Sequence, residues 1–334
     1  MFDHCLIQGR GVNPAEYHTI KHERGDPQHP VSPSMLKAFT ACPARWKAGY
    51  QSPESDSKAF GSLLDCRLLT PEQFAGRYAI QPATYKAPES AKKDAPLVDK
   101  PWSNNANICK DWCEGQREKG KEIVKAGDIA DVDAARTRLL ADPILAAWHE
   151  ACDTQVWVQG EWYDEGTQLT IPVRCLLDYV PRIGTEFAEC LGDLKTSASG
   201  SLRFFSRNVY AMGYHLQAAF DLALYEEATK EDRRNWVFIG IENFSPWQPF
   251  RRMLSPDYIE IGKRSFDTAL RYYCKCLKEN VWPGYDDNAD AVQGWSLVNP
   301  DPFMEYESVS NHMLSEVSKE LTMEQKLEAA GLGN

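Results

Sequence analysis

Two β-prone segments joined by a short turn place the strongest constraint on how this chain folds. The first is Val173–Val180, with Asp178 near its end, and the second runs from Glu186 to Lys195. Side chains alternate along a strand, so Asp193 and Lys195 project from the same side of the second segment. If the two segments pair as a hairpin, Asp178 lies beside Asp193. Two carboxylates and an ammonium would then meet at one edge of a sheet.

A metal site is the simplest interpretation of this group of charges. Like charges held close together are costly unless a cation neutralises them, and carboxylate oxygens suit a hard divalent ion. A mostly apolar helix is also predicted at residues 59–69, and it carries Gly61 and Asp65 one turn apart on one face. The small glycine lets another backbone approach, which makes Asp65 a further candidate ligand. The alternative is a surface carboxylate on a helix that only packs.

Composition places the chain among ordinary globular proteins. Its 334 residues suffice for one elaborated domain or two small ones, and 43% hydrophobic with 25% charged residues is typical of soluble proteins. The first residues lack the basic and apolar regions of a signal peptide, and no apolar run is long enough to cross a bilayer. We therefore expect a cytoplasmic protein with no membrane partner. The net charge of −11 argues against non-specific coating of nucleic acid but permits a local basic groove.

Ten cysteines raise the question of disulfides or a metal cluster. A long chain without a secretion signal does not predict a disulfide framework. The closest pairs, Cys109 with Cys113 and Cys274 with Cys276, do not have the spacing of a zinc ribbon. Reduced thiols in the core are the simpler interpretation, and an iron–sulfur cluster built from four distant cysteines stays open.

Three regions flank or interrupt the predicted domain, which spans residues 34–304. Residues 1–33 are polar and punctuated by proline, and they predict a solvated N-terminal arm. Residues 81–105 are rich in proline, alanine, lysine and aspartate, and they predict a loop. This loop would be the first part of an insertion of loops and helices over about 81–150. Residues 305–334 are polar again and predict a C-terminal tail helix.

One long helix is predicted after the acidic strand, from Leu202 to Ala228. A polar and aromatic stripe recurs along it at steps of three and four residues, and we interpret it as a wall of the metal site. The members of this stripe are Tyr210, Tyr214, Gln217, Asp221 and Tyr225. Amphipathic packing is the alternative. Two strands at 236–241 and 250–254 follow, and then a helix at 258–279 whose basic face either follows a phosphate backbone or is simply solvated.

In this order the motifs resemble those of the PD-(D/E)XK nuclease superfamily and, within it, the RecE-type (exonuclease VIII-like) branch of phage recombination exonucleases. The similarity spans about residues 30 to 305. The segments that carry it are Gly61–Asp65, Leu68–Phe74, Cys175–Asp178, Asp193–Thr196 and the helical segment Tyr214–Phe220.

The resemblance implies both a fold and a reaction. The fold would be an α/β domain with a central mixed β-sheet flanked by helices, the restriction-endonuclease-like core, with helical insertions. The reaction would be Mg²⁺-dependent hydrolysis of phosphodiesters at double-stranded DNA ends, from 5′ to 3′, with Mn²⁺ able to substitute. The implied partners are DNA ends, a RecT-like single-strand annealing protein and further copies of the chain in a homo-oligomeric ring.

The resemblance also assigns roles to individual residues. The implied catalytic residues are Asp178, Asp193, Lys195 and Gln217. The implied metal ligands are Asp65, Asp178, Asp193 and the backbone carbonyl of Leu194. The implied substrate contacts are Tyr214, His215 and Thr196.

Two positions depart from the family's pattern. Asp65 stands where the family usually has histidine, and Asp221 stands where its glutamine-containing helix has tyrosine. An aspartate still offers oxygen to Mg²⁺ or Mn²⁺, whereas loss of the tyrosine leaves substrate contacts to Tyr214 or Tyr225.

Three alternative functions stay open. They are a RecB-type or CRISPR-adaptation nuclease with an iron–sulfur cluster, a catalytically silent protein that binds DNA ends, and a metal-binding structural domain.

Overall fold

The computed structural model describes residues 1–90, 95–285, 291–292 and 295–296. Residues Met1–Trp282 form one compact unit and Pro283–Asn334 a second. The described part of the second unit contains an antiparallel pair, β11 (Ala291–Val292) and β12 (Trp295–Ser296). The tail helix predicted at 305–334 lies outside the described residues.

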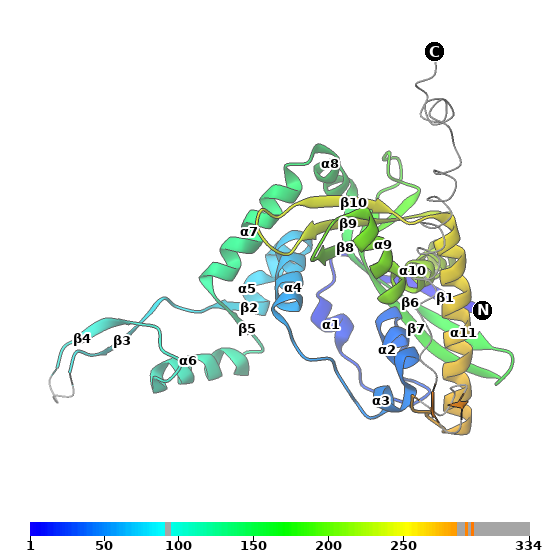
Figure 1. Ribbon diagram of the computed structural model, residues 1–334, viewed down its shortest axis with the longest axis horizontal. Helices are drawn as coiled ribbons and strands as arrows, with labels where there is room; N and C mark the ends of the chain where they lie inside the picture. Colours follow the sequence, from blue (N-terminus) through cyan, green and yellow to red (C-terminus); the bar gives the residue numbers. More distant parts are fainter. Residues whose placement is uncertain (91–94, 286–290, 293–294, 297–334) are drawn as a thin grey trace, which may run out of the picture. The chain divides into compact units, whose positions relative to one another are not determined.

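A six-stranded sheet in the order β1-β6-β7-β8-β9-β10 forms the centre of the first unit (Figure 1). Its strands are β1 (Phe2–Gly9), β6 (Cys152–Asp164), β7 (Leu169–Pro181), β8 (Cys190–Ser197), β9 (Asn235–Glu242) and β10 (Pro249–Met253). Neighbouring strands run antiparallel except β8 and β9, which run parallel. The predicted central mixed sheet is therefore confirmed.

Helices cover both faces of this sheet, as the predicted α/β fold requires (Figure 1). One face packs against α2 (Pro33–Ala41), α10 (Tyr214–Thr229) and α11 (Pro256–Glu279), and the other against α4 (Asp56–Leu69), α7 (Ala126–Leu140) and α8 (Pro143–Ala151). The shorter elements are α1 (Pro14–His18), α3 (Pro43–Lys47), η1 (Pro71–Gln73), α5 (Phe74–Arg77), β2 (Tyr78–Ile80), β5 (Glu122–Val124), α6 (Asn107–Glu118) and α9 (Leu202–Ala211). None of the helices in the described ranges is long and apolar enough to cross a membrane.

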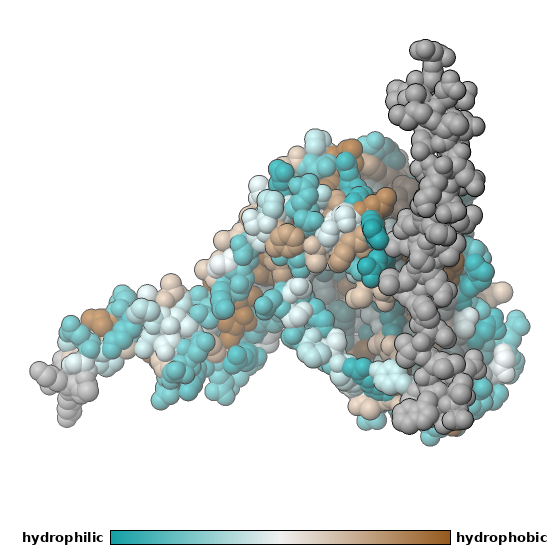
Figure 2. Space-filling model, in the orientation of Figure 1, coloured by the Kyte–Doolittle hydropathy of each residue, from teal (hydrophilic) through white to brown (hydrophobic). Residues whose placement is uncertain are grey.

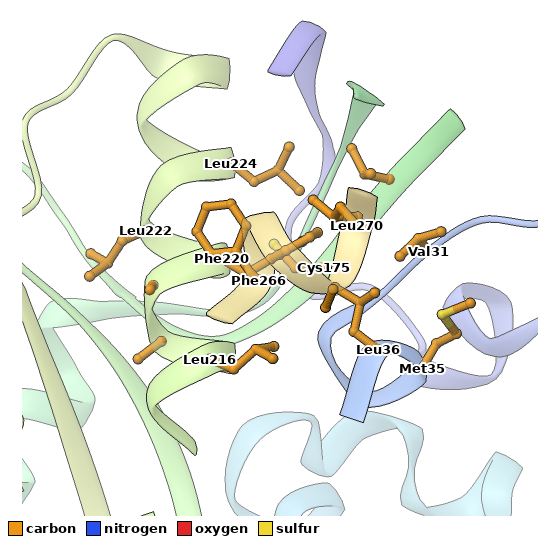
Figure 3. Close-up of a cluster of buried hydrophobic side chains, with 14 of the residues drawn as sticks. Val31, Met35, Leu36, Cys175, Leu216, Phe220, Leu222, Leu224, Phe266 and Leu270 are labelled. Atoms are coloured by element: carbon orange, nitrogen blue, oxygen red, sulfur yellow. The ribbon is translucent and has the colours of Figure 1, made fainter. Parts of the chain in front are cut away.

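The larger hydrophobic core lies between the sheet and the helices α2, α10 and α11 (Figure 3). Phe220 of α10 meets Phe266 of α11 edge to face, with ring centroids 5.7 Å apart. The two helix backbones approach closely because residue 262 is glycine. A Cβ atom on Gly262 would lie 2.1 Å from the carbonyl oxygen of His215. This contact fixes the position of α10. Unlike this apolar core, the face of the molecule drawn in Figure 2 is mostly hydrophilic.

The prediction of one continuous helix from Leu202 to Ala228 was wrong. Between α9 and α10 the chain passes through Gly213, whose φ is 62°. A left-handed residue ends the run of α-helical hydrogen bonds, and glycine adopts that conformation without steric cost. The predicted stripe is broken as a result, and Tyr210 stacks on the ring of His215 with centroids 5.4 Å apart.

The prediction that residues 1–33 form a solvated arm was also wrong. Its first segment, β1, is an edge strand of the main sheet, and Tyr17 and His29 are buried. An edge strand buries one face only, here through Phe2 against Phe220 at 5.5 Å between ring centroids, so its composition stays polar.

Residues 81–105, predicted as a loop, contain an antiparallel hairpin. Its strands are β3 (Thr84–Pro88) and β4 (Leu97–Pro101), and both alternate between exposed and half-buried residues. A ladder with so little buried surface leaves almost no hydrophobic pattern in the sequence, which is why composition alone indicated a loop.

The close approach of α10 and α11 gives a first test. We expect Gly262→Ala to lower the free energy of unfolding by about 1–3 kcal/mol, because the added methyl group meets rigid backbone. The matched control is Gly115→Ala in α6, where a Cβ meets nothing within 4 Å and stability should rise by about 0.5–1 kcal/mol. Urea unfolding measures both, and a fully stable Gly262→Ala variant would contradict this packing.

Candidate active site

The candidate site forms where β7 and β8 separate. The two strands share one ladder pair, Tyr179 with Gly192. Two residues beyond Gly192, the backbone N–H of Leu194 donates to Oδ2 of Asp178 at 2.9 Å instead of to a strand carbonyl. A carboxylate thus takes the place of a ladder partner. The predicted hairpin pairing is confirmed, and it brings Asp178 next to Asp193.

A glutamine that the sequence analysis missed connects Asp178 to a third acid. Gln155 of β6 has a φ of 47° and interrupts the ladder between β6 and β7. Its Nε2 lies 3.1 Å from Oδ1 of Asp178 and 3.1 Å from Oδ1 of Asp65. Asp65 of α4 is therefore at the site, as predicted. No pattern in the sequence distinguishes a left-handed glutamine inside a strand.

Helix α4 reaches this position because Gly61 allows it to lie against β8. A Cβ atom on Gly61 would lie 3.2 Å from Oγ1 of Thr196. Thr196, predicted as a substrate contact, is therefore half-buried and packs toward α4. Its backbone follows directly after Lys195, so it lies at the rim of the site.

On the other side of Asp193, a chain of polar contacts runs to helices α10 and α2. The Lys195 ammonium forms an ion pair with Oδ2 of Asp193, and Gln217 donates from Nε2 to Oδ1 of Asp193 at 3.1 Å. Lys37 of α2 donates to Oε1 of Gln217 at 3.1 Å. The ammonium groups of Lys195 and Lys37 lie 5.1 Å and 5.6 Å from the ring centroid of Tyr214. No role for Lys37 is predicted from the sequence.

Burial makes the carboxyl groups hard to ionise. It raises the pKa of Asp65 to about 6, an effect opposed by Arg77 and reinforced by Asp193. Burial and the charges of Asp193 and Asp65 raise the pKa of Asp178 well above its usual value. Burial lowers the pKa of Lys195, but the two facing carboxylates outweigh it and raise that pKa above the ordinary lysine value. Lys195 is therefore an ammonium group here and not a base.

The carboxylate oxygens of Asp65, Asp178 and Asp193 suit a hard divalent cation, although in this structure they do not converge on a single cation position. Among the described residues, no three His, Cys, Asp or Glu side chains are arranged to hold a metal ion. The amide of Gln155 lies between Asp65 and Asp178, and the ammonium of Lys195 lies on Asp193. Both supply the partial or full positive charge that buried carboxylates need. Carboxylate oxygens are the ligands that Mg²⁺ prefers, so these residues fit Mg²⁺ once the two donors move aside.

Three other predicted residues on α10 do not reach the carboxylates. His215 is buried, and its Nδ1 lies 3.1 Å from the carbonyl oxygen of Val209. Asp221 lies in the core against the thiol of Cys175, and burial raises its pKa well above the usual value. Tyr225 is 1% exposed and does not replace the missing tyrosine. These placements leave the predicted role of His215 in substrate contact without structural support.

The ten cysteines, all within the described ranges, are free thiols. They form no group of three that could hold a metal ion in the part of the chain that the structure describes. The iron–sulfur alternative therefore gains no support from their positions.

A family model matches residues 32–294 and is described as a PDDEXK-like domain of unknown function (DUF3799). The chain belongs to this family. Membership confirms the PD-(D/E)XK superfamily and the fold class predicted from the motifs. No curated protein matches the chain.

One solved structure, from Eubacterium rectale and described as a "Putative exonuclease", shares the fold of this DUF3799 member. The TM-score is 0.54 at 14% sequence identity, over 89% of this chain and 98% of that chain. Rai1 from Scheffersomyces stipitis, at 10% identity over 75% of this chain and 73% of that one, gives a TM-score of 0.26, which is too low to carry an argument. Family and fold together support a nuclease.

The raised pKa of Asp65 predicts how stability depends on pH. Unfolded, the carboxyl ionises near its ordinary pKa of 3.8, whereas the folded protein keeps the proton up to about pH 6. Stability therefore falls as pH rises through this window, and the full penalty is present above it. Asp65→Asn, which keeps the oxygen that accepts from Gln155, should be more stable at pH 7 in EDTA by about 1–3 kcal/mol.

Urea unfolding between pH 4 and 8 measures this difference. The gap between wild type and Asp65→Asn should open between about pH 4 and 6 and then stay constant. Asp133→Asn is the matched control, because Asp133 is 41% exposed and forms an ion pair with Arg67. A pH-independent gap for Asp65→Asn would show that Asp65 is not buried among like charges.

Proposed function

We propose that this protein is a RecE-type, Mg²⁺-dependent exodeoxyribonuclease that hydrolyses phosphodiesters at double-stranded DNA ends. The observation that carries the proposal is the convergence of Asp65, Asp178, Asp193 and Lys195 where β7 and β8 separate, in a chain of the PDDEXK-like family. Digestion from 5′ to 3′, use of Mn²⁺, a RecT-like annealing partner and a ring of identical chains are supported by the sequence resemblance alone.

In this proposal, the three aspartates and the carbonyl of Leu194 hold the cation. Bound there, Mg²⁺ activates a water molecule and offsets the charge that develops on the phosphate. Lys195 stays an ammonium group, so its task is to orient that water and stabilise negative charge. Gln217 holds Asp193 in one rotamer through its 3.1 Å hydrogen bond. Tyr214 and Thr196 are the proposed contacts to the terminal nucleotide.

Substitution of the two central residues tests the proposal. Asp193→Asn removes a ligand charge and Lys195→Ala removes the ammonium, so each should slow digestion of linear duplex DNA in Mg²⁺ by about 100-fold or more. Duplexes labelled separately at each 5′ and 3′ terminus report the polarity. Undiminished digestion by both variants would reject the assignment, and binding of ends by a wild type that cleaves nothing would identify a silent end-binding protein.

Lys37 provides a second test of the same site. Its ammonium fixes the amide of Gln217 with Oε1 toward Lys37 and Nε2 toward Asp193. Lys37→Met keeps the aliphatic stem but not the donor, so we expect kcat to fall about ten-fold while KM changes little. Lys37→Arg should recover part of the loss. Lys119→Met, at an exposed residue directly after α6, is the control, and an unchanged kcat for Lys37→Met would exclude this positioning role.

A further inference from the structure

A polar cavity of about 400 Å³ lies on the sheet at β1, β6 and β7, beneath the segment 19–30. The residues that carry charge or a donor into it include Lys21, His22, Trp157 and Arg174. Within the described residues it shares no lining residue with the candidate active site. Its chemistry is not used by the proposed reaction.

Arg174 is the unusual member of this cavity. The residue is 6% exposed, and no carboxylate in the described part of the chain lies within ion-pair distance of it. Its Nε is buried without a hydrogen-bond acceptor, and its Cζ lies 4.5 Å from the ring centroid of Tyr17. A guanidinium removed from water without an anion carries a desolvation cost that a cation–π contact offsets only in part.

A second buried donor lines the same cavity. The indole Nε1 of Trp157 is also buried without an acceptor. Gln159 is the ladder partner of Arg174, and Trp157 is two residues from Gln159, so all three project from the same face of the sheet. Two donors on adjacent strands, a guanidinium and an indole, therefore share one cavity and both require an acceptor.

The rest of the lining favours a negatively charged occupant. Lys21 adds a second cation at the mouth, while Glu161 is the acid among the described lining residues. Ordered water would satisfy the two donors, but it would leave the guanidinium charge unneutralised. A phosphate group supplies both the charge and several oxygens, and it matches the planar donor fork of arginine.

We propose that this cavity binds a phosphate group, held by Arg174 and Trp157 with Lys21 at its mouth. Arg174 precedes Asp178 by four residues on β7, which corresponds to about 13 Å along the strand. On the proposed nuclease function, that separation lets a DNA strand at the carboxylates also reach this cavity. The two sources of the phosphate are thus a nucleic-acid backbone and a free 5′-mononucleotide.

The indole proton of Trp157 is a direct probe of the cavity. We would follow its signal in ¹H–¹⁵N TROSY spectra of the full chain, assigned with Trp157→Phe, while adding inorganic phosphate or thymidine 5′-monophosphate in EDTA. A saturable shift is the expected result. Arg174→Gln should weaken binding about ten-fold or more, and Lys21→Ala about two- to five-fold, because Lys21 is exposed. Lys119→Ala is the exposed control and should bind as wild type does.

Several outcomes decide the proposal. No saturable shift, or equal binding by wild type, Arg174→Gln and Lys21→Ala, would overturn it. Lys21 is exposed, so its variants keep the test decisive if Arg174→Gln does not fold. Tighter binding of a single-stranded oligonucleotide than of the mononucleotide supports the pocket and assigns the phosphate to DNA. Equal binding supports the pocket and assigns it to a free nucleotide.

The measurement is independent of cleavage. Asp193→Asn should bind phosphate like wild type although it loses nuclease activity. A wild type that binds phosphate but never cleaves DNA would therefore reject the proposed function and leave the phosphate cavity intact.

Discussion

Repulsion among three carboxylates, of which Asp193 is buried and Asp65 and Asp178 are half-buried, is the constraint on which the rest of the site depends. Asp65, Asp178 and Asp193 come from a helix and two strands and meet where the sheet opens. The groups that contact their oxygens are donors, among them the Leu194 N–H and the Gln155 amide. Such a cluster destabilises the fold, so large apolar surfaces elsewhere must offset it.

The two hydrophobic cores supply that compensation and also position the helices that carry the site residues. The core under α10 and α11 holds the helix that carries Gln217, and the core under α4 and α7 holds the helix that carries Asp65. Glycine permits both placements, since Gly262 brings α11 onto α10 and Gly61 brings α4 onto β8. The site is therefore assembled by packing on both faces of the sheet, while the sheet itself supplies Asp178, Asp193 and Lys195.

Local patterns predicted the parts of this arrangement that are local in sequence. The hairpin that brings Asp178 next to Asp193 follows from alternation and a short turn, and Asp65 follows from helical spacing beside a glycine. Gln155 was missed because its role depends on a backbone conformation that its neighbours do not encode, and Lys37 because it acts 180 residues away on Gln217. The edge strand β1 was not predicted from the sequence for a related reason, since one exposed face keeps its composition polar.

The aspartate at position 65 is consistent with this charge arrangement. A histidine there would contribute a neutral ligand, whereas Asp65 adds a third negative charge beside Asp178. The cluster then repels itself more strongly and gains more from a hard divalent cation. These carboxylates now contact the amide of Gln155 and the ammonium of Lys195, and under the proposed function a bound cation would take the place of those contacts. Under the proposed function, Lys195 released from Asp193 would then be able to contact a phosphate oxygen, so cation binding and substrate binding would reinforce each other through a single side chain.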